Sequence, residues 1–549
     1  MEKKYLNESR YKKGNSRKRR NAKTVRSNIR EEKALSPKIQ HKDISKKKPP
    51  VKSKQKKKKN KKNKKENKTL NIIICVVLLI LIGLISRAIL KDKDEPFIYF
   101  PFMTRANEEV IKIGVITSDS LLDKNTTNIV MNELNKYSKD MLLEVNEDYS
   151  ITYKCISNIQ KKSNSEYILT INPKSKVKAS NIKETLEHHI NNEASLHYTK
   201  LKNISSISLI DNENMSIKLK QPDEYFIFNL DVCLNTSNDL TNYIQDATSN
   251  KDRLVLNRHK DADKQLPEKV IVTKYKDMYA AAEAYKKQEI NIFVTDAENV
   301  QNILGKYEYS IKAYRNGKSI FLFGNPKSDL YSRIEVRKAI AYGIDRDGII
   351  QEVLKSKGEK IDLPYIYDNV KYKYDVYAAE NLLLTSQYTK SNKVYSKKEN
   401  GKKITLELDL VVNKNDEIKI NIANKIKNNL NSIGIKINIV ELTEAKLIDR
   451  IKNGNYDLCL ANVNLNNTPN ISFVEPNLYI TEDINATKNN INLSNVEDLN
   501  KKIYNLQYAL SNQISAIGIY SDVSYVIYSQ DIMGIDKVVY MNLFKNILT

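Results

Sequence analysis

The pattern of apolar and polar positions changes abruptly near residue 69. Residues 69–86 (TLNIIICVVLLILIGLIS) carry no formal charge and show no polar face. With residues 87–90 the segment reaches about 20 residues, the length that crosses a bilayer. This apolar stretch is longer than that of a cleaved signal peptide. The pattern therefore predicts one transmembrane helix over residues 69–90.

After residue 108 the apolar positions follow either the two-residue period of a strand or the 3.6-residue period of a helix. The expected strands are 110–116, 167–171, 404–410, 435–439 and 456–460, and the expected helices are 127–137, 180 onward, 418–433 and 447–451. Gly434 and Gly454 follow two of these helices as expected stops. Strands and helices that alternate in this way predict an α/β fold with a parallel or mixed sheet covered by helices.

Charge divides the chain at the same place as hydropathy. Residues 1–68 contain 29 Lys and Arg against 6 Asp and Glu, a net charge of +23, whereas the whole chain carries +25. Residues 69–549 are therefore nearly neutral at +2, which argues against a nucleic-acid-binding protein. The basic segment 1–68 has too little apolar surface to fold, so we expect a disordered tail. Its excess of lysines predicts that the tail stays in the cytoplasm and that the chain beyond residue 90 faces outward.

Signatures of catalysis are missing from the sequence. It contains neither a His-Glu-x-x-His nor a Gly-x-Ser-x-Gly motif. The Gly317-Lys318-Ser319 tripeptide resembles the end of a phosphate-binding loop, but Lys312 stands where that loop needs its first glycine. The four cysteines show no paired spacing, which excludes a disulfide framework and a cysteine-rich zinc module. We therefore expect no enzyme, no catalytic residue, no metal site and no cofactor.

Two groups of titratable residues have an ordinary structural interpretation. His188, His189 and His197 lie on or beside a predicted helix, and we expect them to be exposed. Asp345 and Asp347 flank Arg346, with which we expect a solvated ion pair.

Residues 334–350 (IEVRKAIAYGIDRDGII) resemble the signature of the family 5 extracellular solute-binding proteins, the peptide- and nickel-binding partners of ABC importers. Within this segment Val336, Ile340 and Ile344 form an apolar stripe, while Ala339 and Gly343 are small enough for close helix–sheet contact. Other segments resemble the family in the same order, namely 110–120, 166–186, 206–230, 270–293, 320–325, 374–388, 455–460 and 517–520.

The resemblance implies a two-lobe, type II periplasmic-binding-protein fold of the Venus-flytrap kind. It would follow the transmembrane helix and a juxtamembrane linker at 91–108. Lobe one would comprise residues 109–320 and 516–549, and lobe two residues 321–515. Hinges are expected near Asn325 and Ser515.

The ligand is expected in the cleft between the lobes. Peptide-binding members commonly carry a tryptophan and an aspartate after the last matched strand, but residues 460–467 (LANVNLNN) contain neither. A neutral polar site is therefore expected there in place of a charged contact. The ligand-binding residues we expect are Thr117, Ser118, Asn325, Asn462 and Asn464.

The resemblance implies a single-pass protein of the bacterial plasma membrane that captures a small, peptide-like ligand for an ABC permease. An alternative is a degenerate member that acts as a receptor or scaffold without transport and signals or anchors through its basic tail. Such a tail can attract anionic lipid at about 1 kcal/mol per Lys or Arg near the surface. Specific nucleic-acid binding is not expected, and the sequence does not identify the ligand.

Overall fold

The computed structural model describes residues 110–548 apart from 124, 125, 127, 196, 235–240, 298, 369–371 and 493–495. The predicted tail, transmembrane helix and linker (1–68, 69–90 and 91–108) lie outside the described residues. Residues 101–549 form one compact unit, separate from residues 1–100. Within the described part of the chain, no helix is both long and apolar enough to cross a membrane.

Most strands of the described residues belong to one ten-stranded sheet with the order β17-β16-β18-β12-β19-β11-β1-β10-β9-β8. Its strands are β1 (Val110–Ile116), β8 (Tyr243–Gln245), β9 (Arg253–Arg258), β10 (Lys269–Tyr275), β11 (Ile292–Thr295), β12 (Ser310–Gly324), β16 (Glu407–Asn413), β17 (Lys436–Leu442), β18 (Leu458–Asn464) and β19 (Ile517–Tyr528). Strand β1 is parallel to β10 and β11, and β16 is parallel to β17 and β18. The other pairs are antiparallel, so the predicted mixed sheet is confirmed.

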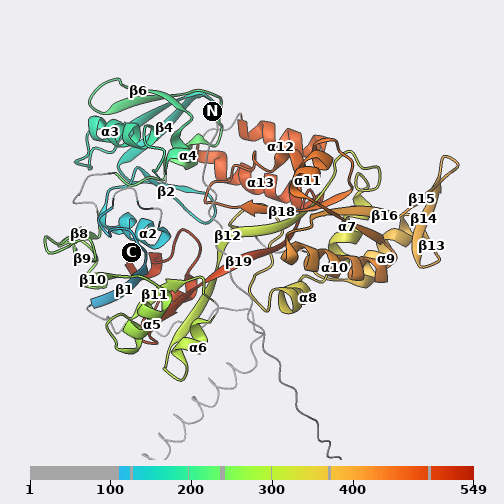
Figure 1. Cartoon of the computed structure of the whole chain (residues 1–549). Helices are drawn as coiled ribbons and strands as arrows, with labels where there is room; N and C mark the ends of the chain where they lie inside the picture. Colours follow the sequence, from blue (N-terminus) through green and yellow to red (C-terminus); the bar gives the residue numbers. More distant parts are fainter. Residues whose placement is uncertain are drawn as a thin grey trace, which may run out of the picture. The chain divides into compact units, whose positions relative to one another are not determined.

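Smaller sheets and helices surround this sheet (Figure 1). The sheets are β4-β5-β7-β6 (Ile156–Ser163, Glu166–Ile171, Asn214–Leu219 and Ile204–Leu209), β2-β3 (Leu143–Val145 and Ile151–Tyr153) and β13-β14-β15 (Thr389–Ser391, Val394–Glu399 and Lys402–Thr405). The helices are α2 (Ile129–Ser138), α3 (Ala179–Ile190), α4 (Tyr198–Leu201), α5 (Met278–Lys286), α6 (Val300–Leu304), α7 (Ile334–Gly343), α8 (Arg346–Gly348), α9 (Val376–Thr385), α10 (Glu417–Ser432), α11 (Glu444–Lys452), α12 (Glu482–Asn492), α13 (Leu499–Asn512) and α14 (Lys545–Leu548).

Local sequence signals account for most of these elements. Gly434 and Gly454 end α10 and α11 at φ values of 92° and 69°, where a residue without Cβ is least strained. Asp416 begins α10 by accepting a hydrogen bond from the Lys419 amide at 3.0 Å. The strand expected at 456–460 is wrong at both ends, because β18 starts at Leu458 and continues to Asn464. It continues because Val463 is buried and the pairing with β12 extends to that point.

The helix of the family signature packs as its apolar pattern predicts. Val336 and Ile340 of α7 are fully buried in an apolar cluster with α9, α10 and the strands β16 and β17. A Cβ added at Gly343 would lie 2.6 Å from Cδ1 of Ile433. Gly343 therefore permits close packing against the end of α10, whereas the sequence predicted close contact with the sheet.

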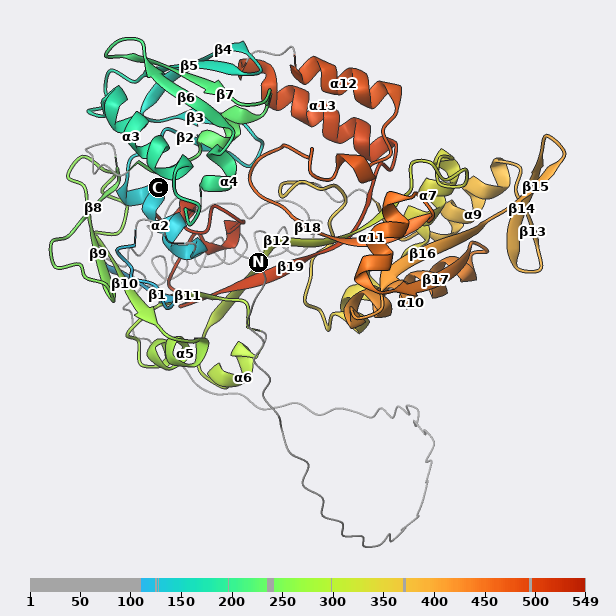
Figure 2. The ribbon, with the colours of Figure 1, turned by 45° about the horizontal axis from the view of Figure 1, so that its top comes forward.

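Two long strands, β12 and β19, belong to both halves of the ten-stranded sheet. Strand β12 pairs with β19 along most of its length and with β18 over residues 318–324, while β19 also pairs with β11. Figures 1 and 2 show both strands running from the half that contains β1 to the half that contains β16.

The lobe boundary expected after residue 320 falls inside the strand β12. One apolar cluster also joins residues of 142–234 with residues of 456–516, so the cores of the two predicted lobes are contiguous.

The pairing of β12 with β19 is irregular between Arg315 and Ser319. Gly317 lies in this interval at a φ of 85°, and its carbonyl oxygen accepts a hydrogen bond from the Leu465 amide at 2.8 Å. A Cβ added at Gly317 would lie 2.7 Å from the carbonyl oxygen of Leu465. Both the positive φ of Gly317 and the close approach of the Leu465 carbonyl, just after β18, therefore require glycine at this position.

We expect Gly317→Ala to lower the free energy of unfolding by about 2–4 kcal/mol, because strain at positive φ adds to a clash with backbone. Gly401→Ala is the matched control, since Gly401 has a φ of 78° but nothing within 4 Å of an added Cβ. Its cost should be only about 1 kcal/mol. Urea unfolding of the fragment 101–549 measures both changes, and equal losses would show that the contact with Leu465 is unimportant.

Candidate functional site

A cavity of about 770 Å³ lies where segments from both halves of the sheet meet. The β2–β3 turn, β12 and the segment after β19 form its walls on the side of β1. The loop 359–368 and α13 form its walls on the other side. The lining residues are Glu147, Asp148, Tyr149, Lys312, Ala313, Tyr314, Arg315, Glu359, Ile366, Tyr367, Asp368, Asn500, Lys501, Ile503, Tyr504, Gln507, Val538, Val539 and Tyr540. Tyrosines and charges of both signs dominate this surface.

An ion pair connects the cavity wall to the shared strand. Arg315 of β12 donates to Oδ1 of Asp368 at 2.5 Å, and its Nε lies 3.4 Å from the Glu359 carboxylate. The other oxygen of Asp368 accepts the backbone amides of Asp362 and Leu363 at 2.7 and 3.1 Å. Burial raises the pKa of Asp368 above its ordinary value, against the opposing effect of Arg315. The loop 359–368 is thereby fixed to the strand beside the cavity.

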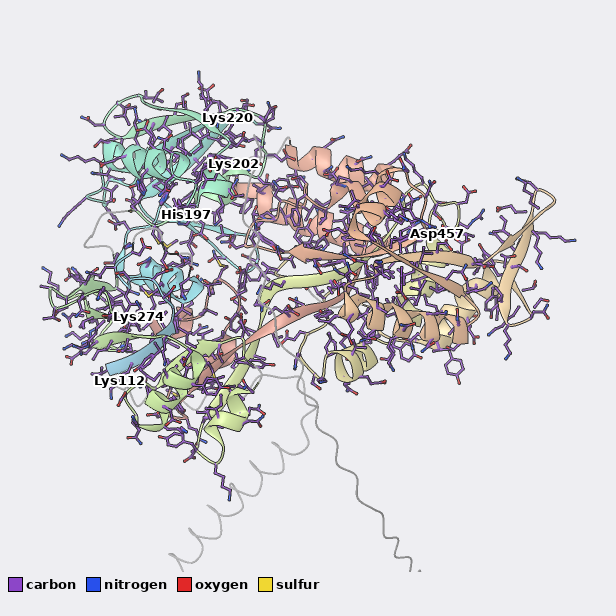
Figure 3. The ribbon with its side chains drawn as sticks, in the orientation of Figure 1. Lys112, His197, Lys202, Lys220, Lys274 and Asp457 are labelled. Carbon is purple, nitrogen blue, oxygen red and sulfur yellow. The ribbon has the colours of Figure 1, made fainter. Side chains whose placement is uncertain are left out.

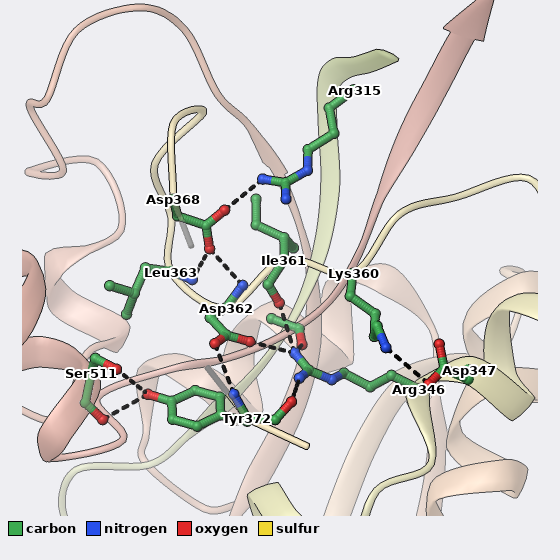
Figure 4. A network of polar contacts seen from close by, with 11 residues as sticks. Arg315, Arg346, Asp347, Lys360, Ile361, Asp362, Leu363, Asp368, Tyr372 and Ser511 are labelled. Carbon is green, nitrogen blue, oxygen red and sulfur yellow. Dashed lines mark hydrogen bonds and ion pairs between the residues drawn. The ribbon is translucent and has the colours of Figure 1, made fainter. Parts of the chain in front are cut away.

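A second arginine, Arg346, holds the same loop from behind (Figure 4). Its Nη1 donates to Oδ1 of Asp362 at 2.6 Å and to the carbonyls of Ile361 and Gly518 at 3.0 and 3.1 Å. Its Nη2 donates to the carbonyl of Tyr372. The side chains of both Arg346 and Asp362 are almost fully buried. These hydrogen bonds from one buried side chain hold the loop in place at the cavity wall.

This network corrects the expectation that Arg346 forms a solvated ion pair with its sequence neighbours. Asp345 accepts the Gly348 amide at 2.9 Å and caps a helical turn, while Asp347 pairs with Lys360 at 2.9 Å. Arg346 turns inward because Asp362, sixteen residues later, is the carboxylate that the fold brings to it.

A smaller cavity of about 310 Å³ shares Tyr540 with the first. It lies between α2, the segment 197–200 and the residues just after β18. Asn467 donates to Oδ2 of buried Asp231, and Lys200 donates to Oδ1 of Asn467 at 3.5 Å. Oδ1 of Asp231 and Nδ1 of His197 are buried without a hydrogen-bond partner among the described residues. Polar side chains, some of them buried, therefore line this inner cavity.

The two histidines that line this cavity, His189 and His197, are not the exposed residues that the sequence predicted, whereas His188 outside it is exposed. His189 is buried, and its Nδ1 lies 2.7 Å from the Ser195 hydroxyl. Burial lowers the pKa of His197 to about 2 and that of His189 to about 4, so both rings are neutral near pH 7. Across the described residues, no group of three or more His, Cys, Asp or Glu side chains could hold a metal ion.

Thr117 and Ser118 lie together in the turn after β1. The Thr117 amide donates to the Tyr275 carbonyl at 3.0 Å. Lys274, which is labelled in Figure 3, donates to the Ser118 carbonyl at 2.9 Å. Neither residue lines the two cavities described above.

Asn325 is buried and holds neighbouring backbone. Its Nδ2 donates to the carbonyls of Gly454 and Tyr456, both at 2.8 Å. It lines an open depression of about 390 Å³ with Asp457, whose carboxylate accepts the Ser328 hydroxyl and the Asp409 amide. Asn325 therefore has a structural task apart from the two cavities.

Asn462 and Asn464 are exposed on β18, opposite Ile320 and Lys318 of β12. Neither lines a cavity described above, and the binding role of the five predicted residues stays a prediction. The segment 460–467 was nevertheless informative, because Asn466 and Asn467 at its end line the inner cavity. No sequence signal singled out Arg315, Asp368 or Tyr504.

A sequence model of the family described as bacterial extracellular solute-binding proteins, family 5, middle, matches residues 174–484. The match covers more than half of the chain. The chain belongs to family 5. The predicted family is thus confirmed, and with it the expectation that this chain is not an enzyme, because family 5 proteins bind solutes.

Individual relatives of this family 5 protein are distant. Oligopeptide-binding protein AppA of Bacillus subtilis (strain 168) is 24% identical over 147 residues, which are 25% of this chain and 27% of AppA. The chain thus aligns with about a quarter of that curated relative.

Solved structures match over far more of the chain. The unliganded, open form of the periplasmic murein tripeptide binding protein MppA has a TM-score of 0.61 at 14% identity, covering 80% of this chain and 98% of MppA. A nickel ABC transporter structure from Bacillus halodurans has a TM-score of 0.58 at 16% identity, covering 77% and 96%. These likenesses confirm the mixed α/β fold of periplasmic binding proteins.

We expect Asp362→Asn to lower the free energy of unfolding by about 3–5 kcal/mol, because it leaves the buried Arg346 charge unpaired. Asp347→Asn, which breaks the exposed pair with Lys360, should change it by less than about 1 kcal/mol. Chemical denaturation of the two variants makes the comparison. A loss below 1 kcal/mol for Asp362→Asn would mean that the network does not support the cavity wall.

Proposed function

We propose that this chain is a membrane-anchored, extracellular solute-binding protein that captures a small, peptide-like ligand and delivers it to an ABC permease. The ligand would occupy the cavity between the two halves of the sheet. The predicted helix at 69–90 would anchor the protein in the plasma membrane with its N-terminal tail in the cytoplasm.

The observation that carries this proposal is the position of the 770 Å³ cavity between segments of the two halves. Its volume lies in the range of small-molecule sites. The halves are connected through β12 and β19, and β12 has its irregular pairing and Gly317 beside the cavity residue Arg315. A change of angle at that point would open or close the cavity, as hinge motions do in binding proteins.

The chemistry of the cavity favours a ligand with both charges and apolar groups. Lys312 and Lys501 can bind a carboxylate, and Glu147 and Asp148 can bind an ammonium group. The tyrosines add large apolar faces with polar tips, which suit variable side chains. Short peptides combine these features, in accord with the names of the relatives AppA, an oligopeptide-binding protein, and MppA, a murein tripeptide binding protein.

Tyr504 offers a clean test of the cavity, because it lines the cavity yet is 62% exposed and so contributes little to the core. We expect Tyr504→Ala to weaken binding of peptides at least tenfold through loss of its contact area. Tyr508→Ala on the same helix is the control, since Tyr508 is 53% exposed but does not line the cavity.

The measurement begins with a thermal-shift screen of fragment 101–549 against pooled tri- to pentapeptides, followed by calorimetry with the best peptide. Equal affinities of the two tyrosine variants would remove this cavity as the site. A well-folded fragment that none of the peptides stabilises would contradict the peptide-like ligand and favour the receptor or scaffold alternative.

The proposed orientation predicts a simple protection pattern in intact cells. Protease added outside should digest the chain beyond about residue 95 and leave an epitope placed in the tail intact, because the basic residues hold the tail inside. Immunoblots of the tail epitope and of the C-terminal unit report both ends. A tail epitope digested from outside would reverse the topology.

A further inference from the structure

The three strands β13, β14 and β15 (residues 389–405) form a strongly charged projection, here called the basic hairpin. These residues contain six Lys, one Glu and no Asp, a net charge of +5. All of residues 69–549 carry only +2, so the chain after residue 68 is slightly acidic outside the hairpin. Within 17 residues the hairpin thus carries more positive charge than the net charge of the whole chain after residue 68.

Tight turns give the basic hairpin a defined shape. Asn392 and Lys393 connect β13 to β14 at φ values of 50° and 65°, and Asn400 and Gly401 connect β14 to β15 at 51° and 78°. Two-residue turns with positive φ at both positions match the twist of paired strands. Figures 1 and 2 show the hairpin projecting beyond the end of the main sheet, on the side away from β1.

Two of the six lysines are held by the body of the protein. Lys390 pairs with Glu380 at 2.8 Å and lies over the ring of Tyr395. Lys397 lies 3.5 Å from Glu335 and 3.7 Å from Glu399, the carboxylate that also binds Arg333. The nearby acidic side chains are therefore already engaged.

The other four lysines point their charge to the outside. Lys393, Lys398, Lys402 and Lys403 are exposed and form no ion pair with a described residue. Lys398 and Lys403 stand directly opposite each other on β14 and β15. Like charges in that position destabilise a strand pair. An anion placed against them would remove the repulsion.

We propose that Lys393, Lys398, Lys402 and Lys403 dock the unit onto the anionic phospholipid headgroups of the membrane that anchors it. The four charges spread over an exposed projection and do not line a cavity described above, so they match an extended anionic surface better than a single small anion. The inference rests on the anchored topology of the proposed function. In that topology, the 18 residues of the linker 91–108 limit the distance of residue 109 from the bilayer to about 60 Å, the length of the linker if fully extended.

The test uses fragment 101–549, which is a compact unit by itself and lacks the predicted anchor. It is mixed with vesicles of 30 mol% phosphatidylglycerol in phosphatidylcholine, and binding is measured by co-sedimentation. We expect binding that disappears on pure phosphatidylcholine and in 0.5 M salt, because it is electrostatic. The double variant K398Q/K403Q should lower the partition coefficient at least tenfold.

The control is K287Q/K306Q, which removes the same charge from exposed positions at the ends of α5 and α6, and it should change partitioning less than twofold. The melting temperature of K398Q/K403Q should equal or exceed that of the wild type, because repulsion is relieved. Three results would each overturn the proposal. They are an equal loss of vesicle binding in both double variants, unchanged vesicle binding of K398Q/K403Q, and equal binding of the wild type to neutral vesicles. Intact peptide binding in K398Q/K403Q would leave the proposed function standing in any of these cases.

Discussion

The pairing of β12 with β19 is the interaction on which the rest of the structure depends. The two strands lie in the middle of a ten-stranded sheet, and each is also paired to a strand of one half only, β18 or β11. Every wall of the main cavity is positioned from these strands or from segments packed against them. The pairing is irregular at two places, between Arg315 and Ser319 and between Ile320 and Phe321, and Gly317 lies in the first of them.

A binding cavity built from separate loops needs rigid support, which the buried Arg346 and the partly exposed Arg315 provide. Arg346 donates to the Asp362 carboxylate and to the carbonyls of Ile361 and Tyr372. Arg315 binds Asp368 at the cavity surface. Burying such charges contributes little net stability, since desolvation offsets the attraction. Their effect is specificity, because the hydrogen bonds that they make leave the loop few alternative conformations.

The sequence predicted what depends on local pattern and missed what depends on distant contact. The helix at 417–432, its glycine stop and the packing of Val336 and Ile340 follow from periodicity and side-chain size. The sequence alone could not identify the ion-pair partner of Arg346. Asp345, Asp347 and Asp362 carry the same carboxylate, and only the folded chain brings one of them to the arginine. The residues that line the cavities also depend on such contacts, and the binding role of the predicted residues stays a prediction. Segment 460–467 was noticed, but strand pairing decides that Asn466 and Asn467, not Asn462 and Asn464, line a cavity.

The late position of β19 in the chain has a consequence for biosynthesis. Strands β11 and β12 are complete by residue 324, yet the strand that pairs with both spans residues 517–528. Until the ribosome has passed that point, the facing edges of both strands expose unpaired amides and carbonyls, which are templates for aggregation. A chain that ends before residue 517 therefore lacks the strand that joins β11 to β12 and so connects the two halves of the sheet.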